Sequence, residues 1–255
     1  MKNKIYVSFL LPTRFRTKYL LKSLISIEKN TPKNIYEILI CADKDDNETI
    51  QWAYKNIKRF NLKLIITQRY GYGKLNKYYN LAASQSSGDW LWLWNDDVRL
   101  LTKNWHKIIE LYDKKFLLIN PLTVNDNGYT KYFSTFPILP RKWFKLLGHL
   151  SLWQHSDTYL TRLAHKLFIF QNEHRIKNIH ERIHDSITEQ NIYLKHPLPV
   201  NYFSKDLQVL KNYLGKKKIL INFIKSLPWL ILFTNKEIIR RIKVITQRII
   251  RYVGW

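Results

Sequence analysis

Short apolar runs alternate with amphipathic stretches along the first hundred residues of this chain. The runs are rich in β-branched or aromatic residues and are too short for helices, so they predict strands. They cover Tyr6–Leu11, Tyr36–Ala42, Leu62–Thr67 and Trp90–Trp94. The stretches between them carry apolar residues at helical spacing, most clearly Leu75, Tyr78, Tyr79 and Ala82. Strands and helices that alternate in this way predict a parallel sheet with helices on both faces.

The later part of the chain has a looser pattern. We expect strands in Phe116–Pro121 and Lys131–Pro137, a short helix that ends at Gly148, and a helix over Ser156–Phe168. Thr17 is a candidate N-cap for the first helix of the chain. Residues 176–191 mix His, Arg and acidic side chains with little apolar periodicity, and basic, Ile-rich helical stretches follow residue 204.

The fourth predicted strand runs directly into three polar residues. Five apolar residues, three of them Trp, are followed by Asn95, Asp96 and Asp97. In open α/β sheets, ligands bind beyond the carboxyl ends of the strands. Carboxylates at that edge of a buried sheet are costly unless a cation pairs with them. The triplet therefore predicts a ligand or metal site, and the alternative is a polar turn with a helix cap.

Composition and charge narrow the classes of partner. The chain has 255 residues and a formal net charge of +24, which favours nucleic acid, anionic membranes or phosphorylated substrates. A single cysteine, Cys41, excludes an intramolecular disulfide and favours a reducing cytoplasm. The apolar run at the N-terminus ends at Pro12, too early for a signal peptide. No uninterrupted apolar run is long enough to span a bilayer.

Four segments occur in an order that resembles the family 2 glycosyltransferases of the GT-A type. They read VSFLLPTRFRTKYLLKSLISI, YEILICADKDDNET, GYGKLNKYYNLAASQSSGDWLWLWNDDV and FPILPRKWFKLLGH, and the likeness covers about residues 4–190. The resemblance implies a three-layer α/β/α fold with a mostly parallel sheet and a helical C-terminal extension. It implies a GT-A domain over residues 1–204, with a nucleotide-binding half at 1–101 and an acceptor half at 102–204. Residues 205–255 would form the basic extension.

The resemblance also implies how a nucleotide-sugar donor is held. Asp97 takes the last position of the family's Asp-x-Asp motif and would bind Mn²⁺ or Mg²⁺, hard cations that prefer oxygen ligands. Asn95 stands where the family usually has Asp and would hydrogen-bond a ribose hydroxyl, and Asp96 would be a second carboxylate. The remaining donor-binding candidates are Thr13, Arg14, Asp43 and Lys77.

Several of these donor-binding candidates have ordinary structural alternatives. Arg14 and Lys77 also fit solvated surface positions. Asp45 and Asp46 follow the same strand as Asp43, but we interpret them as turn and helix-cap residues.

Catalysis in the family requires a base and often a late metal ligand. Asp157 stands where an acid would take the proton from the acceptor hydroxyl, although an Asp at a helix start is also a common structural feature. His180 would be a third metal ligand, with His184 as its competitor. The string HERIH matches a zinc-protease pattern, but its segment is polar and the pattern arises often by chance. A solvated basic helix is the other interpretation.

The C-terminal tail has the pattern of a membrane-surface helix. Lys236–Val253 places an Ile stripe opposite six Lys or Arg residues. The alternative is a helix packed on the domain. We therefore predict an inverting, metal-assisted glycosyltransferase that uses a UDP- or GDP-linked sugar and a glycan or lipid-linked acceptor, cytoplasmic and peripheral on the membrane. The rivals are a basic nucleic-acid-binding protein and a nucleotidyltransferase on a related fold.

Overall fold

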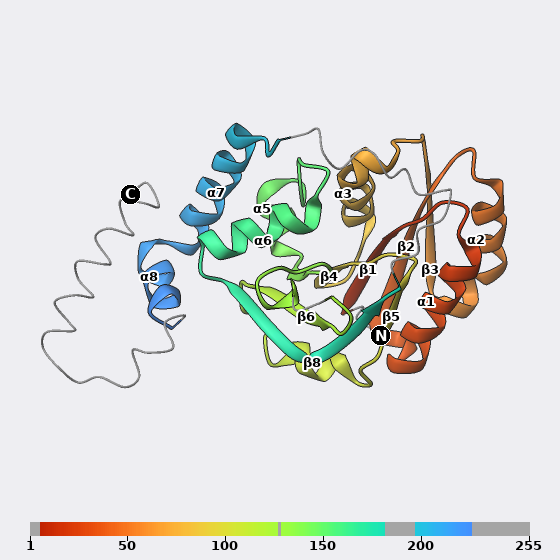
Figure 1. The fold of residues 1–255 in the computed structure, drawn as a ribbon, viewed down its shortest axis with the longest axis horizontal. Helices are drawn as coiled ribbons and strands as arrows, with labels where there is room; N and C mark the ends of the chain where they lie inside the picture. Colours follow the sequence, from red (N-terminus) through yellow and green to blue (C-terminus); the bar gives the residue numbers. More distant parts are fainter. Residues whose placement is uncertain (1–5, 127–128, 182–196, 226–255) are drawn as a thin grey trace, which may run out of the picture.

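The computed structural model describes residues 6–126, 129–181 and 197–225 (Figure 1). Its strands are β1 (Val7–Pro12), β2 (Tyr36–Asp43), β3 (Leu62–Thr67), β4 (Trp90–Leu93), β5 (Val98–Leu100), β6 (Leu118–Thr123), β7 (Ile138–Pro140) and β8 (Phe170–His180). Its helices are α1 (Thr17–Asn30), α2 (Asn47–Phe60), α3 (Leu75–Gln85), α4 (Trp105–Glu110), α5 (Lys142–Leu147), α6 (Ser156–Lys166), α7 (Val200–Leu214) and α8 (Lys216–Lys225). Short 3-10 turns lie at Lys33–Ile35, Tyr72–Lys74 and Tyr129–Lys131.

All eight strands form one sheet in the order β3-β2-β1-β4-β7-β6-β8-β5. The first four strands are parallel, as the alternation of strands and helices predicted. β7 pairs antiparallel with β4 and β6, and β8 pairs parallel with β6 but antiparallel with β5. The predicted three-layer α/β architecture with a mostly parallel sheet is confirmed.

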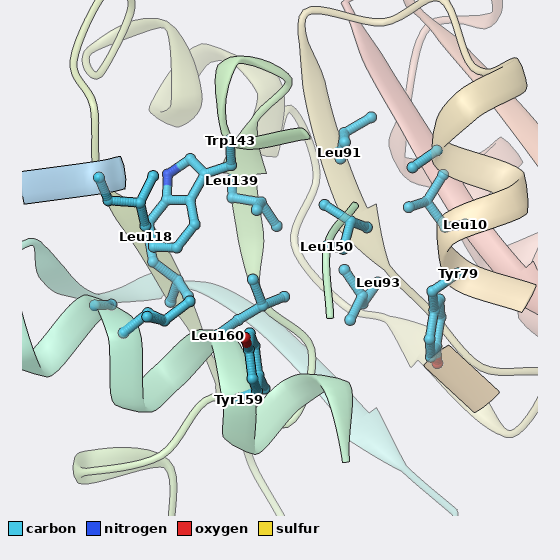
Figure 2. Packing of buried hydrophobic residues seen from close by; sticks show 14 of the residues in the cluster. Leu10, Tyr79, Leu91, Leu93, Leu118, Leu139, Trp143, Leu150, Tyr159 and Leu160 are labelled. Atoms are coloured by element: carbon cyan, nitrogen blue, oxygen red, sulfur yellow. The ribbon is translucent and has the colours of Figure 1, made fainter. Parts of the chain in front are cut away.

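The Trp-rich strand shows how the two faces of the sheet are filled. Trp90, Trp92 and Trp94 point to the side of α1 and α4 and are fully or almost fully buried. Leu91 and Leu93 point to the opposite side, where α3, α5 and α6 cover the sheet (Figure 2). The ring of Trp92 stacks on Phe9 with centroids 5.0 Å apart. Such aromatic pairs contribute about 0.5–1.5 kcal/mol to stability beyond their buried area. The strand thus contributes side chains to the cores on both faces of the sheet.

The sheet is curled. β4 and β5 are four strands apart in the sheet order, yet only residues 94–97 connect them in the chain. β5 packs against α1, on which the Asn30 side chain donates a 3.0 Å hydrogen bond to the carbonyl of Leu100. Residues Asn95–Asp97 therefore lie where the edge strand β5 curls back toward the inner strand β4.

Two predicted local features are wrong. Lys131–Pro137 is not a strand, because its residues form a 3-10 turn and loop and only Ile138–Pro140 pairs with β4. Tyr132 is 67% exposed there, so the segment lacks a continuous buried face. Thr17 does not cap α1, since Arg16 takes the cap position and the Thr17 hydroxyl donates to Glu48.

β8 was missed, because its long polar residues hide an alternating pattern. Glu173 and Asn178 are buried among exposed His174, Arg175 and Lys177, and the register against β6 shifts between Pro121 and Leu122. Ile179 and His180 belong to this strand, so they do not lie on the basic helix or the zinc-protease helix considered for HERIH. His184 lies outside the described residues.

The C-terminal helices lie at the end of the molecule opposite α1 and α2 (Figure 1). α7 packs on α5 and α6, and Leu210 and Leu214 belong to the same core as Leu160 of α6. The predicted boundary between residues 204 and 205 falls inside α7. The tail helix Lys236–Val253 lies outside the described residues. No helix within the described ranges combines the length and apolarity needed to cross a bilayer.

Candidate active site

The candidate site lies at the carboxyl ends of β1, β2 and β4. Thr13 follows β1, Asp43 ends β2, and Asn95–Asp97 follow β4. The three strands are parallel neighbours, so their carboxyl ends bring these residues to one edge of the sheet. His180 reaches the same edge from the end of β8.

Asp96 and Asp97 are nearly buried and are held by the loop between β1 and α1. The Thr13 hydroxyl donates a 2.6 Å hydrogen bond to Asp96 Oδ2. The Arg16 guanidinium donates from Nη1 to Asp96 Oδ1 at 2.9 Å, and its Nη2 lies 3.6 Å from Asp97 Oδ2. A cation therefore pairs with these carboxylates, as their burial requires, and it comes from the chain itself.

His180 meets Asp97 because β5 and β8 pair. The pairing places Val98 opposite His180, and the Glu181 N–H donates to the Asp97 carbonyl at 2.8 Å. His180 Nε2 lies 3.3 Å from Asp97 Oδ1, while the His180 ring packs edge-on against Phe136. The ring is thus held facing the carboxylate.

One oxygen of Asp97 lacks a hydrogen-bond partner. Asp97 Oδ1 is buried and accepts no hydrogen bond, since the His180 contact has an ion-pair distance without hydrogen-bond alignment. Burial acts to raise the pKa of Asp97, but His180 and then Arg16 outweigh it, so the pKa lies below its ordinary value. Asp97 is therefore ionised at neutral pH, the form in which a carboxylate binds a metal ion.

The Asp97–His180 pair fits part of a divalent metal site. Within the part of the chain that the structure describes, no three His, Cys, Asp or Glu side chains form a ready-made metal cluster. An ionised carboxylate oxygen without a hydrogen bond, beside an imidazole nitrogen, can supply two ligands. Mn²⁺ or Mg²⁺ takes further oxygens from water and from substrate phosphates, so two protein ligands are compatible with either ion.

Asn95 is oriented by a tyrosine of α3. The Tyr79 hydroxyl donates a 2.6 Å hydrogen bond to Asn95 Oδ1. Tyr79 is buried in the core cluster that also contains Leu10 and Leu93 (Figure 2). Because the side-chain oxygen of Asn95 already accepts this hydrogen bond, the Asn95 NH₂ group is the part that can donate to a ligand.

Asp43 has both carboxylate oxygens engaged. The Tyr78 hydroxyl donates to Asp43 Oδ1 at 2.5 Å, and Arg14 Nη1 donates to Asp43 Oδ2 at 2.9 Å. Arg14 also forms two hydrogen bonds with exposed Asp45. Asp46 caps α2 by accepting from the Thr49 N–H at 3.0 Å, as its interpretation as a cap predicted.

Lys77 lies on the exposed side of α3, beside the loop that precedes it. Its ammonium group lies 5.0 Å from the centre of the Tyr70 ring. The Tyr78 hydroxyl accepts hydrogen bonds from the N–H groups of Tyr70 and Gly71, which fixes that loop near Asp43. Lys77 is thus at the rim of the site, accessible to a solvated anion.

Asp157 lies in the first turn of α6, and its charge interacts with groups of the candidate site. Burial, opposed by hydrogen bonds from Thr158 and by the charge of His180, raises the pKa of Asp157 to about 6. Its charge in turn acts on Tyr79. The loop before α6 is tied to α3, since Asn80 Oδ1 accepts from the Leu150 N–H at 2.8 Å.

Two residues of the site escaped the sequence reasoning. Arg16 lies two positions after Arg14 in the loop that follows β1. Its nearness to that candidate could have indicated that Arg16 also belongs to the site. Tyr79 was interpreted only as part of an apolar helix face. Its hydroxyl contact with Asn95 depends on how α3 packs on β1, the neighbour of β4 in the sheet, which no local pattern encodes.

Comparison with known proteins now identifies the family. The sequence profile described as Glycosyl transferase family 2 matches residues 8–162, more than half of the chain. The chain therefore belongs to glycosyltransferase family 2, and it is an enzyme of the glycosyltransferase class. No curated protein matches the sequence.

Solved structures support the fold. Staphylococcus aureus TarS 1-349 in complex with UDP-GlcNAc is similar with a TM-score of 0.59 and 15% identity, covering 86% of this chain and 67% of that chain. A Pyrobaculum calidifontis mannosyltransferase in complex with GDP-Man and Mn²⁺ is similar with a TM-score of 0.56 and 10% identity, covering 85% and 72%. The chain spans 44% of the length of a longer TarS structure, which has a TM-score of 0.58 and 15% identity and covers 83% of this chain. The GT-A fold predicted from the four sequence segments is confirmed.

Proposed function

We propose that this chain transfers a sugar from a UDP- or GDP-linked donor to a hydroxyl of a glycan or lipid-linked acceptor, with inversion and with the help of Mn²⁺ or Mg²⁺. The observation that carries the proposal is the convergence of Asp96, Asp97 and His180 at the sheet edge where Thr13 and Asp43 also lie. Two of the similar structures hold UDP-GlcNAc or GDP-Man with Mn²⁺, which supports this class of donor.

Donor binding is assigned to the nucleotide-binding half. Asp43 and Arg14 would contact the base, the Asn95 amide would donate to a ribose hydroxyl, and Lys77 would contact the diphosphate. Thr13 holds Asp96 in place through its 2.6 Å hydrogen bond. Asp97 and His180 would hold the divalent cation, which when bound supplies the positive charge that a diphosphate leaving group requires.

Asp157 is assigned as the general base. As the acceptor oxygen attacks the anomeric carbon, the Asp157 carboxylate takes its proton, and the bond to the diphosphate breaks on the opposite side of the sugar ring. A pKa of about 6 makes Asp157 a better proton acceptor than an ordinary carboxylate while leaving it ionised at pH 7. The position of α6 relative to α3 is supported by the contact of Asn80 with the loop before α6.

The proposed location is the cytoplasmic face of a membrane, as in polysaccharide biosynthesis with lipid-linked acceptors. In the described part of the chain, α8 exposes Leu220 and Ile221 beside Lys217 and Lys218. Apolar and basic side chains on one exposed helix favour an anionic lipid surface. Vesicle flotation of the full chain and of a chain without residues 235–255 tests the contribution of the tail, and equal flotation of both would assign the contact elsewhere.

Isothermal titration with UDP- and GDP-sugars, with and without Mn²⁺, tests the proposed donor class. We expect one nucleotide to bind, and to bind more tightly when Mn²⁺ is present. Lack of binding to any sugar nucleotide would reject the proposal.

Of the rival functions, stacking on nucleic acid has little support, because Trp90, Trp92 and Trp94 are buried and cannot stack on bases. We expect no nucleic acid partner.

A further inference from the structure

The Arg16 guanidinium bridges the two carboxylates of the Asp96–Asp97 pair. Nη1 lies 2.9 Å from Asp96 Oδ1, and Nη2 lies 3.6 Å from Asp97 Oδ2. The three side chains are 15%, 5% and 8% exposed, in the order Arg16, Asp96 and Asp97. Solvent therefore screens these contacts poorly, and Arg16 neutralises part of the charge of the pair.

The backbone between Arg14 and Arg16 explains why the two arginines serve different acids. Phe15 has a positive φ of 50°, a left-handed conformation that is uncommon for a side chain of this size. The Phe15 N–H donates to Asp46 Oδ2 at 2.8 Å, which holds this conformation. Arg14 consequently pairs with Asp43 and Arg16 with Asp96, so each acid has its own arginine.

A divalent cation on Asp97 would place like charges close together. Arg16 already neutralises part of this acidic pair, so adding a dication leaves an excess of positive charge in a nearly buried site. A diphosphate that arrives with the metal removes that excess, because it offers Arg16 a new anionic partner. Arginine is well suited to this exchange, since its planar guanidinium binds carboxylate and phosphate oxygens alike.

We propose that Arg16 is a resident counter-cation of Asp96 and Asp97 that makes metal binding conditional on a nucleoside diphosphate and then binds that diphosphate. This inference rests on the proposed function, because it assumes the Asp97 metal site. The backbone of Arg16 is fixed, since its carbonyl accepts from the Tyr19 and Leu20 N–H groups at 3.0 and 2.9 Å. The exchange therefore requires movement of the side chain alone.

The test measures Mn²⁺ binding to nucleotide-free protein by electron paramagnetic resonance of free Mn²⁺. The titration is repeated with saturating UDP and with saturating GDP. The proteins are the wild type, Arg16→Gln, Arg14→Gln and Asp97→Asn. Arg14→Gln is the matched control for the nucleotide-free titration only, because it removes the same charge from the same loop without touching Asp96 or Asp97. Its proposed contact with the base excludes it as a control for the titrations with nucleotide.

We expect the nucleotide to tighten Mn²⁺ binding to the wild type by at least about 30-fold, within the usual range of coupling between two sites. Arg16→Gln should bind Mn²⁺ alone about 10-fold more tightly than the wild type and reduce the coupling to below about 5-fold. Arg14→Gln should leave the affinity for Mn²⁺ alone within about 2-fold of the wild type.

Two results would overturn the inference about Arg16: equal Mn²⁺ affinity of the wild type with and without nucleotide, or no tighter binding of Mn²⁺ alone by Arg16→Gln. Retained Mn²⁺ binding by Asp97→Asn is a different failure, because it removes the metal site on which the proposed function depends. If Arg16→Gln does not fold, Arg16→Met replaces it, since Met keeps an apolar stem against the Tyr19 ring. The folded Arg16 variant, Gln or Met, then decides the inference by its affinity for Mn²⁺ alone.

Discussion

Asp43 and the Asp96–Asp97 pair lie at the ends of similar strands and contact arginines of the same loop. They differ in whether every carboxylate oxygen accepts a hydrogen bond. Asp43 accepts hydrogen bonds on both oxygens, from Tyr78 and Arg14. Asp97 keeps one buried oxygen without a hydrogen bond and faces a histidine instead. An acid after a strand is therefore not by itself a metal site. The difference lies in whether the fold leaves an oxygen of the acid for a ligand.

Replacing Asp97 by Asn should have the largest effect. It removes the charged oxygen that lacks a hydrogen bond, so we expect a loss of at least about 10³-fold in the rate of sugar transfer. The melting temperature should fall slightly, because the variant loses the charge interactions of Asp97 with His180 and Arg16. The measurements are initial transfer rates and thermal unfolding. Asp113→Asn, at an exposed position, is the control, and an equal loss in that variant would contradict a specific role of Asp97.

Asp157→Asn should reduce the transfer rate by about 10² to 10³-fold while leaving donor binding intact, as expected for loss of a general base. In the wild type, the rate should rise as the pH passes through about 6, because the base must be ionised. Donor titrations and pH–rate profiles test this. A profile that is flat between pH 5 and 7 would reject Asp157 as the base.

The same substitution has a consequence for stability that does not depend on activity. The pKa of Asp157 is raised from 3.8 to about 6, so the folded chain binds this proton more tightly than the unfolded chain. Stability is therefore lost as the pH rises through that window. Asp157→Asn should increase the free energy of unfolding by about 1–2 kcal/mol at pH 8 and by little at pH 4. Denaturant unfolding at both pH values measures the difference, and no gain at pH 8 would contradict the raised pKa.

Asp43→Asn tests the role of the acid whose two oxygens both accept hydrogen bonds. We expect donor binding to weaken about 10-fold, and stability to fall by about 1–3 kcal/mol because a buried carboxylate that holds Arg14 and Tyr78 is lost. Affinity for Mn²⁺ alone should not change. Calorimetry with the nucleotide and with Mn²⁺ separates the two effects. A larger loss of metal affinity than in Asp97→Asn would reverse our assignment of the two acids.

Tyr79→Phe should have the smallest effect. It removes the hydroxyl that orients Asn95 and leaves the ring in the core, so we expect a 3- to 10-fold increase in the dissociation constant of the donor, about 1 kcal/mol. Tyr159→Phe is the matched control, because it removes another buried hydroxyl, which contacts Asp206 and no residue assigned to the donor. If the two variants bind the donor with equal affinity, Asn95 does not contact the donor.

The sequence predicted the nucleotide-binding half well, because its signals are local. Runs such as Trp90–Leu93 bury both faces, so their composition alone predicts parallel strands. The meeting of Asp97 and His180 was predicted only through the family resemblance. It depends on the pairing of β5 with β8, and the register of that pairing is not encoded near either residue. The pairing of Arg16 with Asp96 was also not predicted, because it depends on the backbone conformation of Phe15. The left-handed Phe15 directs the Arg16 side chain away from Asp43, the partner of Arg14.

The short connection between β4 and β5 has a mechanical consequence. In a flat sheet, four strand spacings would separate them by about 19 Å. The link contains a turn closed by the Val98 N–H and the Asn95 carbonyl, so it can reach only about 14 Å. The short Asn95–Asp97 link thus prevents the sheet from flattening. Asp97 in this link contacts His180 at the end of β8. Metal affinity then depends on how closely β8 and β5 hold His180 to Asp97. A substitution in β8 that loosens this pairing should therefore weaken metal binding without changing a ligand.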